Sequence, residues 1–151
     1  RDRDVTGVQT CALPICDVLG FNYGNSNEWL LREEKKSVVD GKKPDGALGF
    51  FFIDCTKDSV YAVIEIKDAN TAIDSPQKRK NNQTPVEQAF SYAHKMGGNC
   101  KWVIVSNIKE TRFYLSSDSS RYQTYYLEEL TDEKKLKELL FLFHKDFFIK
   151  K

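Results

Sequence analysis

The chain has 151 residues, of which 40% are hydrophobic and 13% aromatic, so it can bury one ordinary core and we expect one folded domain. Its formal net charge of +1 excludes the basic excess of a DNA-packaging protein, although an enzyme can offset a basic patch with its own carboxylates. No apolar run approaches the length of a membrane span and no signal peptide is evident, so we expect a cytoplasmic protein with no membrane partner. The four cysteines lack the spacing of a zinc site.

Residues 1–16 differ from the rest of the chain because they show no helical or strand period. The stretch RDRDVTGVQTCALPI resembles translated sequencing-adapter read-through, which implies a non-native or disordered leader. The alternative is an ordinary, poorly patterned terminus. Residues 17–130 have the pattern of a folded domain.

The first part of this domain is polar and weakly patterned. A Gly/Asn-rich turn at 22–27 can cap a helix, so we predict a short helix or helix end over 28–36. A brief strand is expected at Val38-Val39. Residues 40–44 then form a turn, because the proline favours an extended conformation before it.

Two apolar runs, 47–53 and 60–67, flank a tight polar turn and predict an antiparallel hairpin. The hairpin brings the start of its first strand close to the end of its second, so Asp45 and Glu65 should meet in space. Because side chains alternate along a strand, Glu65 and Lys67 project from one face while Ile64 and Ile66 pack on the other. A buried strand that ends in two opposite charges either makes a structural ion pair or holds a site.

A long polar loop follows, over residues 68–84, and carries Lys78, Arg79 and Lys80 in a row. Such a run is usually a solvated loop, but its place beside the paired acids makes a contact with a polyanion such as DNA an alternative. Thr84 and Pro85 begin a helix that we expect to reach Met96. Gln88 and Tyr92 are four residues apart and share a face of this helix.

The remaining elements complete an α/β fold with a mixed central β-sheet flanked by helices. The strand at 101–107 follows the helix and predicts parallel pairing with 60–67 in a βαβ unit. Strands at 111–115 and 122–127 are separated by a Ser/Asp-rich loop. The segment 131–151 forms a last helix with a wide apolar stripe, which suggests a connector to a further domain.

Two carboxylates at strand ends, with a lysine two residues after the second, suit hydrolysis of a phosphodiester bond. Asp45, Glu65 and the backbone carbonyl of Ile66 supply the hard oxygen ligands that Mg²⁺ prefers. The metal polarises the phosphate and activates a water, and Lys67 adds positive charge where the transition state becomes negative.

The order of these residues resembles the PD-(D/E)xK nuclease superfamily. Pro44-Asp45 is similar to its PD, Glu65-Ile66-Lys67 to its E-x-K, and Gln88 and Tyr92 to the Q-x-x-x-Y of RecB-like members. The resemblance covers residues 17–130 and implies a restriction-endonuclease-like core. It also implies a DNA endonuclease that depends on Mg²⁺, with Mn²⁺ as a substitute, whose catalytic residues are Asp45, Glu65 and Lys67.

Within this superfamily the chain is most similar to the amino-terminal nuclease domain of type I and type IIG restriction enzymes. That resemblance implies the cleavage module of a restriction-modification enzyme in phage defence. Its partner would be a methyltransferase, translocase or target-recognition domain. An upstream acid that assists metal binding corresponds to Glu34 or Glu33, and the sequence leaves the choice open.

Each site residue also has an ordinary structural explanation. Asp45 can begin a turn, Glu65 and Lys67 can form a surface pair, and Gln88 and Tyr92 can pack within a helix. The runner-up function is a catalytically inactive module of the same fold that binds nucleic acid or docks a partner. A third interpretation is a structural α/β domain with an incidental ion pair. The intact set of acids and lysine argues against an inactive module, because binding alone does not need carboxylates that face a phosphate.

Overall fold

The computed structural model describes residues 18–22, 28–78 and 82–148, so the predicted leader at 1–16 lies outside the described residues. The elements are, in chain order, β1 (Glu28–Glu33), β2 (Gly46–Phe52), β3 (Ser59–Ile66), α2 (Pro85–Ala93), β4 (Trp102–Ser106), β5 (Glu110–Leu115), β6 (Asp118–Tyr126), the 3₁₀ helix η1 (Leu127–Thr131), α3 (Glu133–Phe143) and α4 (Lys145–Phe148). The strands form one mixed sheet in the order β1-β2-β3-β4-β5-β6. The predicted α/β class, a mixed sheet flanked by helices, is confirmed. Within the described ranges, no helix combines the length and apolarity needed to cross a bilayer.

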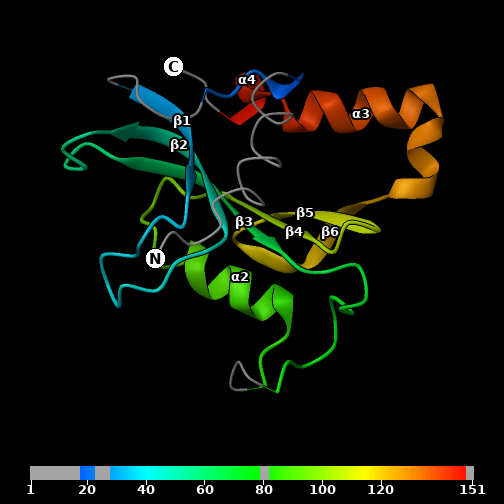
Figure 1. The fold of residues 1–151 in the computed structure, drawn as a ribbon, viewed down its shortest axis with the longest axis horizontal. Helices are drawn as coiled ribbons and strands as arrows, with labels where there is room; N and C mark the ends of the chain where they lie inside the picture. Colours follow the sequence, from blue (N-terminus) through cyan, green and yellow to red (C-terminus); the bar gives the residue numbers. More distant parts are fainter. Residues whose placement is uncertain (1–17, 23–27, 79–81, 149–151) are drawn as a thin grey trace, which may run out of the picture.

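Helices cover both faces of the sheet (Figure 1). On the face of the sheet that α2 covers, apolar side chains of β2, β3, β4 and β5 pack against the helix. This cluster contains, from the strands, Ala47, Phe51, Val63, Val103, Val105 and Tyr114 and, from the helix, Ala89, Phe90, Tyr92 and Ala93. The opposite face carries a second cluster, in which Leu31, Leu48, Ala62, Ile104 and Phe113 meet Phe148 and the partly buried Leu142, Phe143 and Phe147. Because side chains alternate along each strand, Val63 and Glu65 face α2 while Ala62 and Ile64 face α3 and α4.

The β3-α2-β4 unit confirms the predicted βαβ arrangement. β3 pairs with β4 in parallel, with Val63 opposite Val103 and Glu65 opposite Val105. Helix α2 begins at a complete capping box, in which the Thr84 side chain accepts from the backbone N–H of Glu87 and the Glu87 side chain accepts from that of Thr84. It ends at Ala93, three residues before the predicted end. The next turn is tightened by bonds between residues three apart, such as Met96 N–H to the carbonyl of Ala93.

The predicted helix over 28–36 is wrong. Its first six residues form the edge strand β1, which pairs antiparallel with β2 and places Leu31 opposite Leu48, where both are buried. Tertiary pairing therefore overrides the local helical preference. The expected strand at Val38-Val39 is also wrong. Both valines lie exposed in a loop closed by hydrogen bonds from Ser37 N–H to the Lys42 carbonyl (2.8 Å) and from Gly41 N–H to the Ser37 carbonyl (3.1 Å).

Two further predictions fail toward the carboxyl end. The Ser/Asp-rich stretch is not a loop, because β6 begins at Asp118 and only two residues connect it to β5. β6 lies at the sheet edge and is largely exposed, so it lacks the alternation that marks a half-buried strand. The single last helix is broken at His144, whose extended backbone (ψ 141°) separates α3 from α4. This break lets Phe147 and Phe148 turn onto Trp102 and Phe113.

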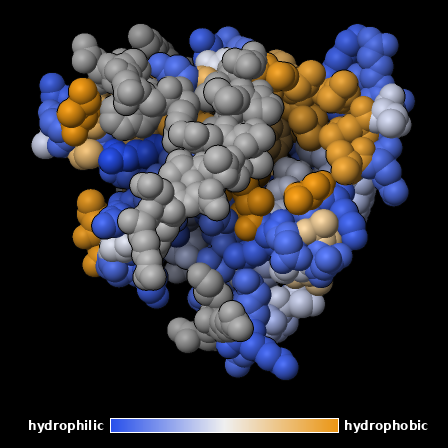
Figure 2. Space-filling model, viewed as in Figure 1, coloured by the Kyte–Doolittle hydropathy of each residue, from blue (hydrophilic) through white to orange (hydrophobic). Residues whose placement is uncertain are grey.

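Helix α3 has no buried residue, and its apolar side chains contribute to the hydrophobic surface in Figure 2. Phe141 is 70% exposed and Leu136 is 38% exposed. The two described cysteines differ in burial. Cys100 is buried, whereas Cys55 is exposed in the turn between β2 and β3, with a positive φ of 56°.

Candidate active site

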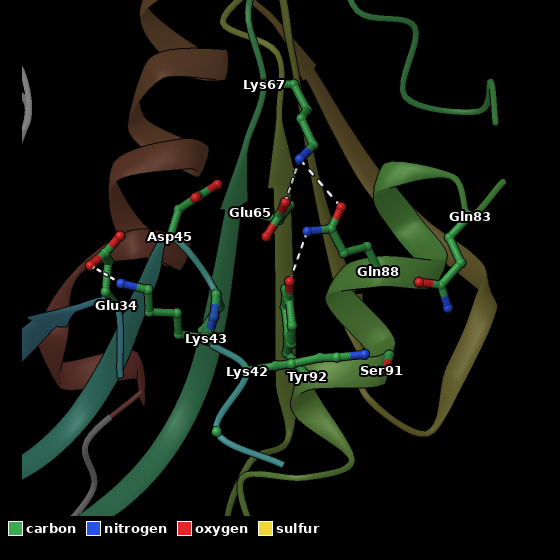
Figure 3. A pocket seen from close by; sticks show the side chains of 12 residues that line it. Glu34, Lys42, Lys43, Asp45, Glu65, Lys67, Gln83, Gln88, Ser91 and Tyr92 are labelled. Carbon is green, nitrogen blue, oxygen red and sulfur yellow. Dashed lines mark hydrogen bonds and ion pairs between the residues drawn. The ribbon is translucent and has the colours of Figure 1, made fainter. Parts of the chain in front are cut away.

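A cavity of about 570 Å³ opens at the carboxyl end of β3, between the start of β2 and helix α2 (Figure 3). Three segments far apart in the sequence supply its walls: the loop before β2, the end of β3, and α2 with the loop that precedes it. It is lined by Glu34, Gly41, Lys42, Lys43, Pro44, Asp45, Glu65, Lys67, Gln83, Gln88, Ser91 and Tyr92. The cavity thus brings together Asp45, Glu65, Lys67, Glu34, Gln88 and Tyr92, which are the residues expected to be catalytic or supporting.

The hairpin register places Asp45 beside Glu65. Gly46 pairs with Ile64, so the next positions along the two strands are Asp45 and Glu65. Pro44 is fully buried and fixes the chain where it enters the strand. One carboxylate oxygen of Asp45, Oδ2, accepts a hydrogen bond from the backbone N–H of Ile66 at 2.7 Å. Asp45 therefore bridges to the residue that separates Glu65 from Lys67.

Glu65 and Lys67 form an ion pair at the end of β3, with Lys67 Nζ 2.5 Å from Glu65 Oε1. Glu65 is 1% exposed and the Lys67 side chain is 15% exposed. Because a buried carboxylate loses its hydration, a close ammonium and good geometry are needed to offset that loss. The backbone N–H of Lys67 donates to the Ser106 carbonyl at 2.7 Å, which continues the pairing with β4 past the end of β3 and fixes the lysine. The shared face predicted for Glu65 and Lys67 is confirmed, but Ile66 on the other face is 45% exposed rather than packed.

Helix α2 contributes a buried amide that touches Lys67. Gln88 Oε1 lies 3.4 Å from Lys67 Nζ, and Gln88 Nε2 donates to the Tyr92 hydroxyl at 2.9 Å (Figure 3). Gln77, from the long loop, also donates to Gln88 Oε1, at 3.3 Å. These three bonds orient the amide with its oxygen toward Lys67. Sequence reasoning missed Gln77, because no periodicity marks a contact made from within a polar loop.

The structure distinguishes the two upstream acids. Glu34 lines the cavity and forms an ion pair with Lys43, whereas Glu33 is not among the lining residues. Glu33 pairs with Gly46 and lies two residues after Leu31, so its side chain faces the opposite side of the sheet. Glu34 immediately follows the last residue of β1 and has a positive φ of 48°. This backbone conformation ends the regular alternation of side chains between the two faces of the strand.

Of the three basic residues expected to contact DNA, the structure describes only Lys78, which is exposed and does not line the cavity. Arg79 and Lys80 lie outside the described residues. Besides Lys67, the basic residues Lys42 and Lys43 line the cavity from the loop before β2. The sequence signal that could have found them is their position immediately before Pro44-Asp45.

The loop between β3 and α2 is anchored to the sheet by a buried arginine. Arg112 on β5 is 7% exposed and donates to both carboxylate oxygens of Asp74, from Nη1 and Nη2 at 2.7 Å each. The bond to Arg112 lowers the pKa of Asp74 below its ordinary value of 3.8. Ile73 is buried beside it, and Asn107 Nδ2 donates to the Thr71 carbonyl at 2.9 Å. These contacts hold the loop that carries Gln77.

The donor set of the cavity fits one class of metal better than others. In the part of the chain that the structure describes, no three His, Cys, Asp or Glu side chains are grouped to hold an ion. Two acids are enough for Mg²⁺, which commonly takes only one or two carboxylates and keeps several waters. The N–H of Lys67 faces β4 and that of Ile66 faces Asp45. Since N–H and C=O of one strand residue point the same way, the carbonyl of Ile66 lies on the side of Asp45.

Comparisons with known proteins add little to this geometry. No family model and no curated protein matches the sequence. Among solved structures, the chain is similar to one determined by cryo-electron microscopy for a DrdV–DNA complex, with 17% identity and a TM-score of 0.46. The similarity covers 82% of this chain and 71% of that one.

Proposed function

We propose that this domain is a Mg²⁺-dependent DNA endonuclease with the PD-(D/E)xK arrangement and a restriction-endonuclease-like core. The observation that carries the proposal is the convergence of Asp45, Glu65 and Lys67 from two neighbouring strands on one cavity, with Gln88 of the crossover helix in contact with the lysine. An incidental surface ion pair does not explain it, because Glu65 is almost fully buried at the wall of a polar cavity. A module that only binds nucleic acid also does not need two adjacent carboxylates that face a phosphate.

Each residue has a role in this proposal. Asp45 and Glu65, with the carbonyl of Ile66, would hold Mg²⁺, which supplies a Lewis acid for the phosphate and lowers the pKa of a bound water. Lys67 holds a positive charge beside Glu65, where the phosphate becomes more negative in the transition state. Gln88 and Tyr92 orient the lysine, and Glu34 adds a third carboxylate at the rim of the cavity. Mn²⁺ would serve as a substitute because it prefers similar oxygen ligands.

The biological role that we propose rests on the resemblance to restriction enzymes. We propose the cleavage module of a restriction-modification enzyme, which works with a methyltransferase, translocase or target-recognition domain. Such a module needs no sequence readout of its own, because a separate domain selects the target.

The test is conversion of supercoiled plasmid to nicked or linear DNA with Mg²⁺ or Mn²⁺, compared with EDTA. We expect metal-dependent cutting that is lost in Lys67→Ala and in Asp45→Asn. It should be retained in Lys57→Ala, a matched control in the exposed turn at the other end of the hairpin. Circular dichroism checks that each variant is folded.

Undiminished cutting by Asp45→Asn, Glu65→Gln and Lys67→Ala would refute the site. Absence of cutting by the wild type, together with no divalent-ion binding in calorimetry, would favour the catalytically inactive binding module.

A further inference from the structure

The loop from Ser37 to Lys42 is a closed, hydrogen-bonded unit at the mouth of the cavity. Besides the two backbone bonds that close it, Asp40 Oδ1 accepts from the backbone N–H of Lys42 at 3.1 Å. The other oxygen of Asp40 binds Lys95 Nζ, next to the end of α2, at 2.7 Å. This bond lowers the pKa of Asp40 below its ordinary value. The loop is therefore attached to the turn that follows the helix carrying Gln88 and Tyr92.

Lys42 lines the cavity, and its ion pair with Asp40 is long. Its ammonium lies 4.0 Å from Asp40 Oδ2, the oxygen that Lys95 contacts more closely, and its side chain is 64% exposed. In Figure 3 the Lys42 side chain extends toward α2, where Ser91 lines the same cavity. Lys43, by contrast, forms an ion pair with Glu34. Lys42 thus presents a positive charge, on a positioned backbone, to a cavity that Ser91 also lines.

We propose that Lys42 and Ser91 form a subsite for a backbone phosphate of the DNA strand that lies next to the phosphate at Asp45 and Glu65. A lysine ammonium and a serine hydroxyl are common phosphate contacts, and neither reads the base sequence. The positive charge also offsets the carboxylates of the cavity, which would otherwise repel a polyanion. This subsite rests on the proposed function for its ligand.

The experiment measures DNA binding without cleavage. A fluorescein-labelled 20-base-pair duplex is titrated with the full chain in EDTA, by fluorescence anisotropy, at several salt concentrations. Because one phosphate contact releases about 0.9 counterion, Lys42→Ala should reduce the slope of log K against log salt by about 0.9 and weaken binding about five- to tenfold near 0.1 M salt. Lys42→Arg should keep the wild-type slope, since arginine also binds phosphate. Ser91→Ala should weaken binding without changing the slope.

Lys57→Ala is the control for a change in net charge alone, because it removes the same charge from the opposite end of the hairpin. A slope for Lys42→Ala equal to that of Lys57→Ala would overturn the subsite. No binding by the wild type would overturn the subsite and the DNA substrate together. Binding that depends on Lys42, in a chain that cuts no DNA with Mg²⁺ or Mn²⁺, would support the subsite while refuting the endonuclease.

Discussion

The Asp45 carboxylate accepts a hydrogen bond from the backbone N–H of Ile66, at 2.7 Å, across the open end of the β2-β3 hairpin. Asp45 therefore has two separable properties. Its oxygen joins two strands, and its charge contributes to the acidic pair with Glu65.

Substitutions at Asp45 can separate these properties. Asp45→Asn keeps a carbonyl oxygen as acceptor and should retain wild-type stability, but it loses the charge and so weakens Mg²⁺ binding. Asp45→Ala loses both and should cost about 1 kcal/mol of unfolding free energy. Urea denaturation and calorimetric titration with Mg²⁺ measure the two effects. Equal Mg²⁺ affinity in Asp45→Asn and the wild type would exclude this carboxylate as a ligand.

Removing the ammonium from the Glu65–Lys67 pair should destabilise the fold. Lys67→Met takes away the cation beside a carboxylate that is 1% exposed, and such a loss costs about 3–5 kcal/mol. The double variant Glu65→Gln/Lys67→Met removes both charges and should recover much of this loss. A double-mutant cycle in urea tests the coupling. Strictly additive effects of the two substitutions would show that the pair contributes no interaction energy.

The Arg112–Asp74 pair should make stability depend on pH at the acidic end. Arg112 lowers the pKa of Asp74 in the folded state, so the contribution is complete above the unfolded-state pKa and is lost as pH falls through the lower, folded-state value. The stability difference between the wild type and Asp74→Asn should therefore be constant from pH 7 to about 5 and shrink below about 3.9. Because the Asp74 side chain is 71% exposed, the difference at pH 7 should not exceed about 1 kcal/mol.

The control for this effect is the same substitution in an Arg112→Met background. There Asp74→Asn should have almost no effect at any pH. A pH-dependent difference that persists without the arginine would assign the effect to another partner.

The two described cysteines should differ in thiol reactivity. Burial raises the pKa of Cys100 to about 12, so at pH 8 the thiol stays protonated and enclosed, whereas Cys55 is exposed. In a Cys11→Ser/Cys16→Ser background, we expect one fast reaction with a disulfide reagent, lost in Cys55→Ser. Cys100 should react only after denaturant is added. Fast labelling of Cys100 in the folded protein would contradict its burial.

Much of the sheet and the order of the site residues could be predicted from the sequence, because their signals are local. The apolar runs on either side of a polar turn predicted the β2-β3 hairpin, and its antiparallel pairing alone brings Asp45 to Glu65. Thr84 and Pro85 predicted the start of α2, and the following strand predicted the parallel β3-β4 pair. Side-chain alternation was enough to place Glu65 and Lys67 on one face.

Tertiary contacts decided the features whose partners are distant in sequence. Residues 28–33 form a strand because Leu31 finds a buried partner in Leu48, against a local pattern that favours a helix. Gln77 reaches Gln88 from a loop that Arg112 holds on the sheet through Asp74. Lys42 and Lys43 line the cavity for the same reason, since hydrogen bonds and the Asp40–Lys95 pair, rather than any periodicity, place their loop. Local pattern thus determined which segments form the central sheet and its crossover helix, and long-range pairing determined which polar side chains surround the acids.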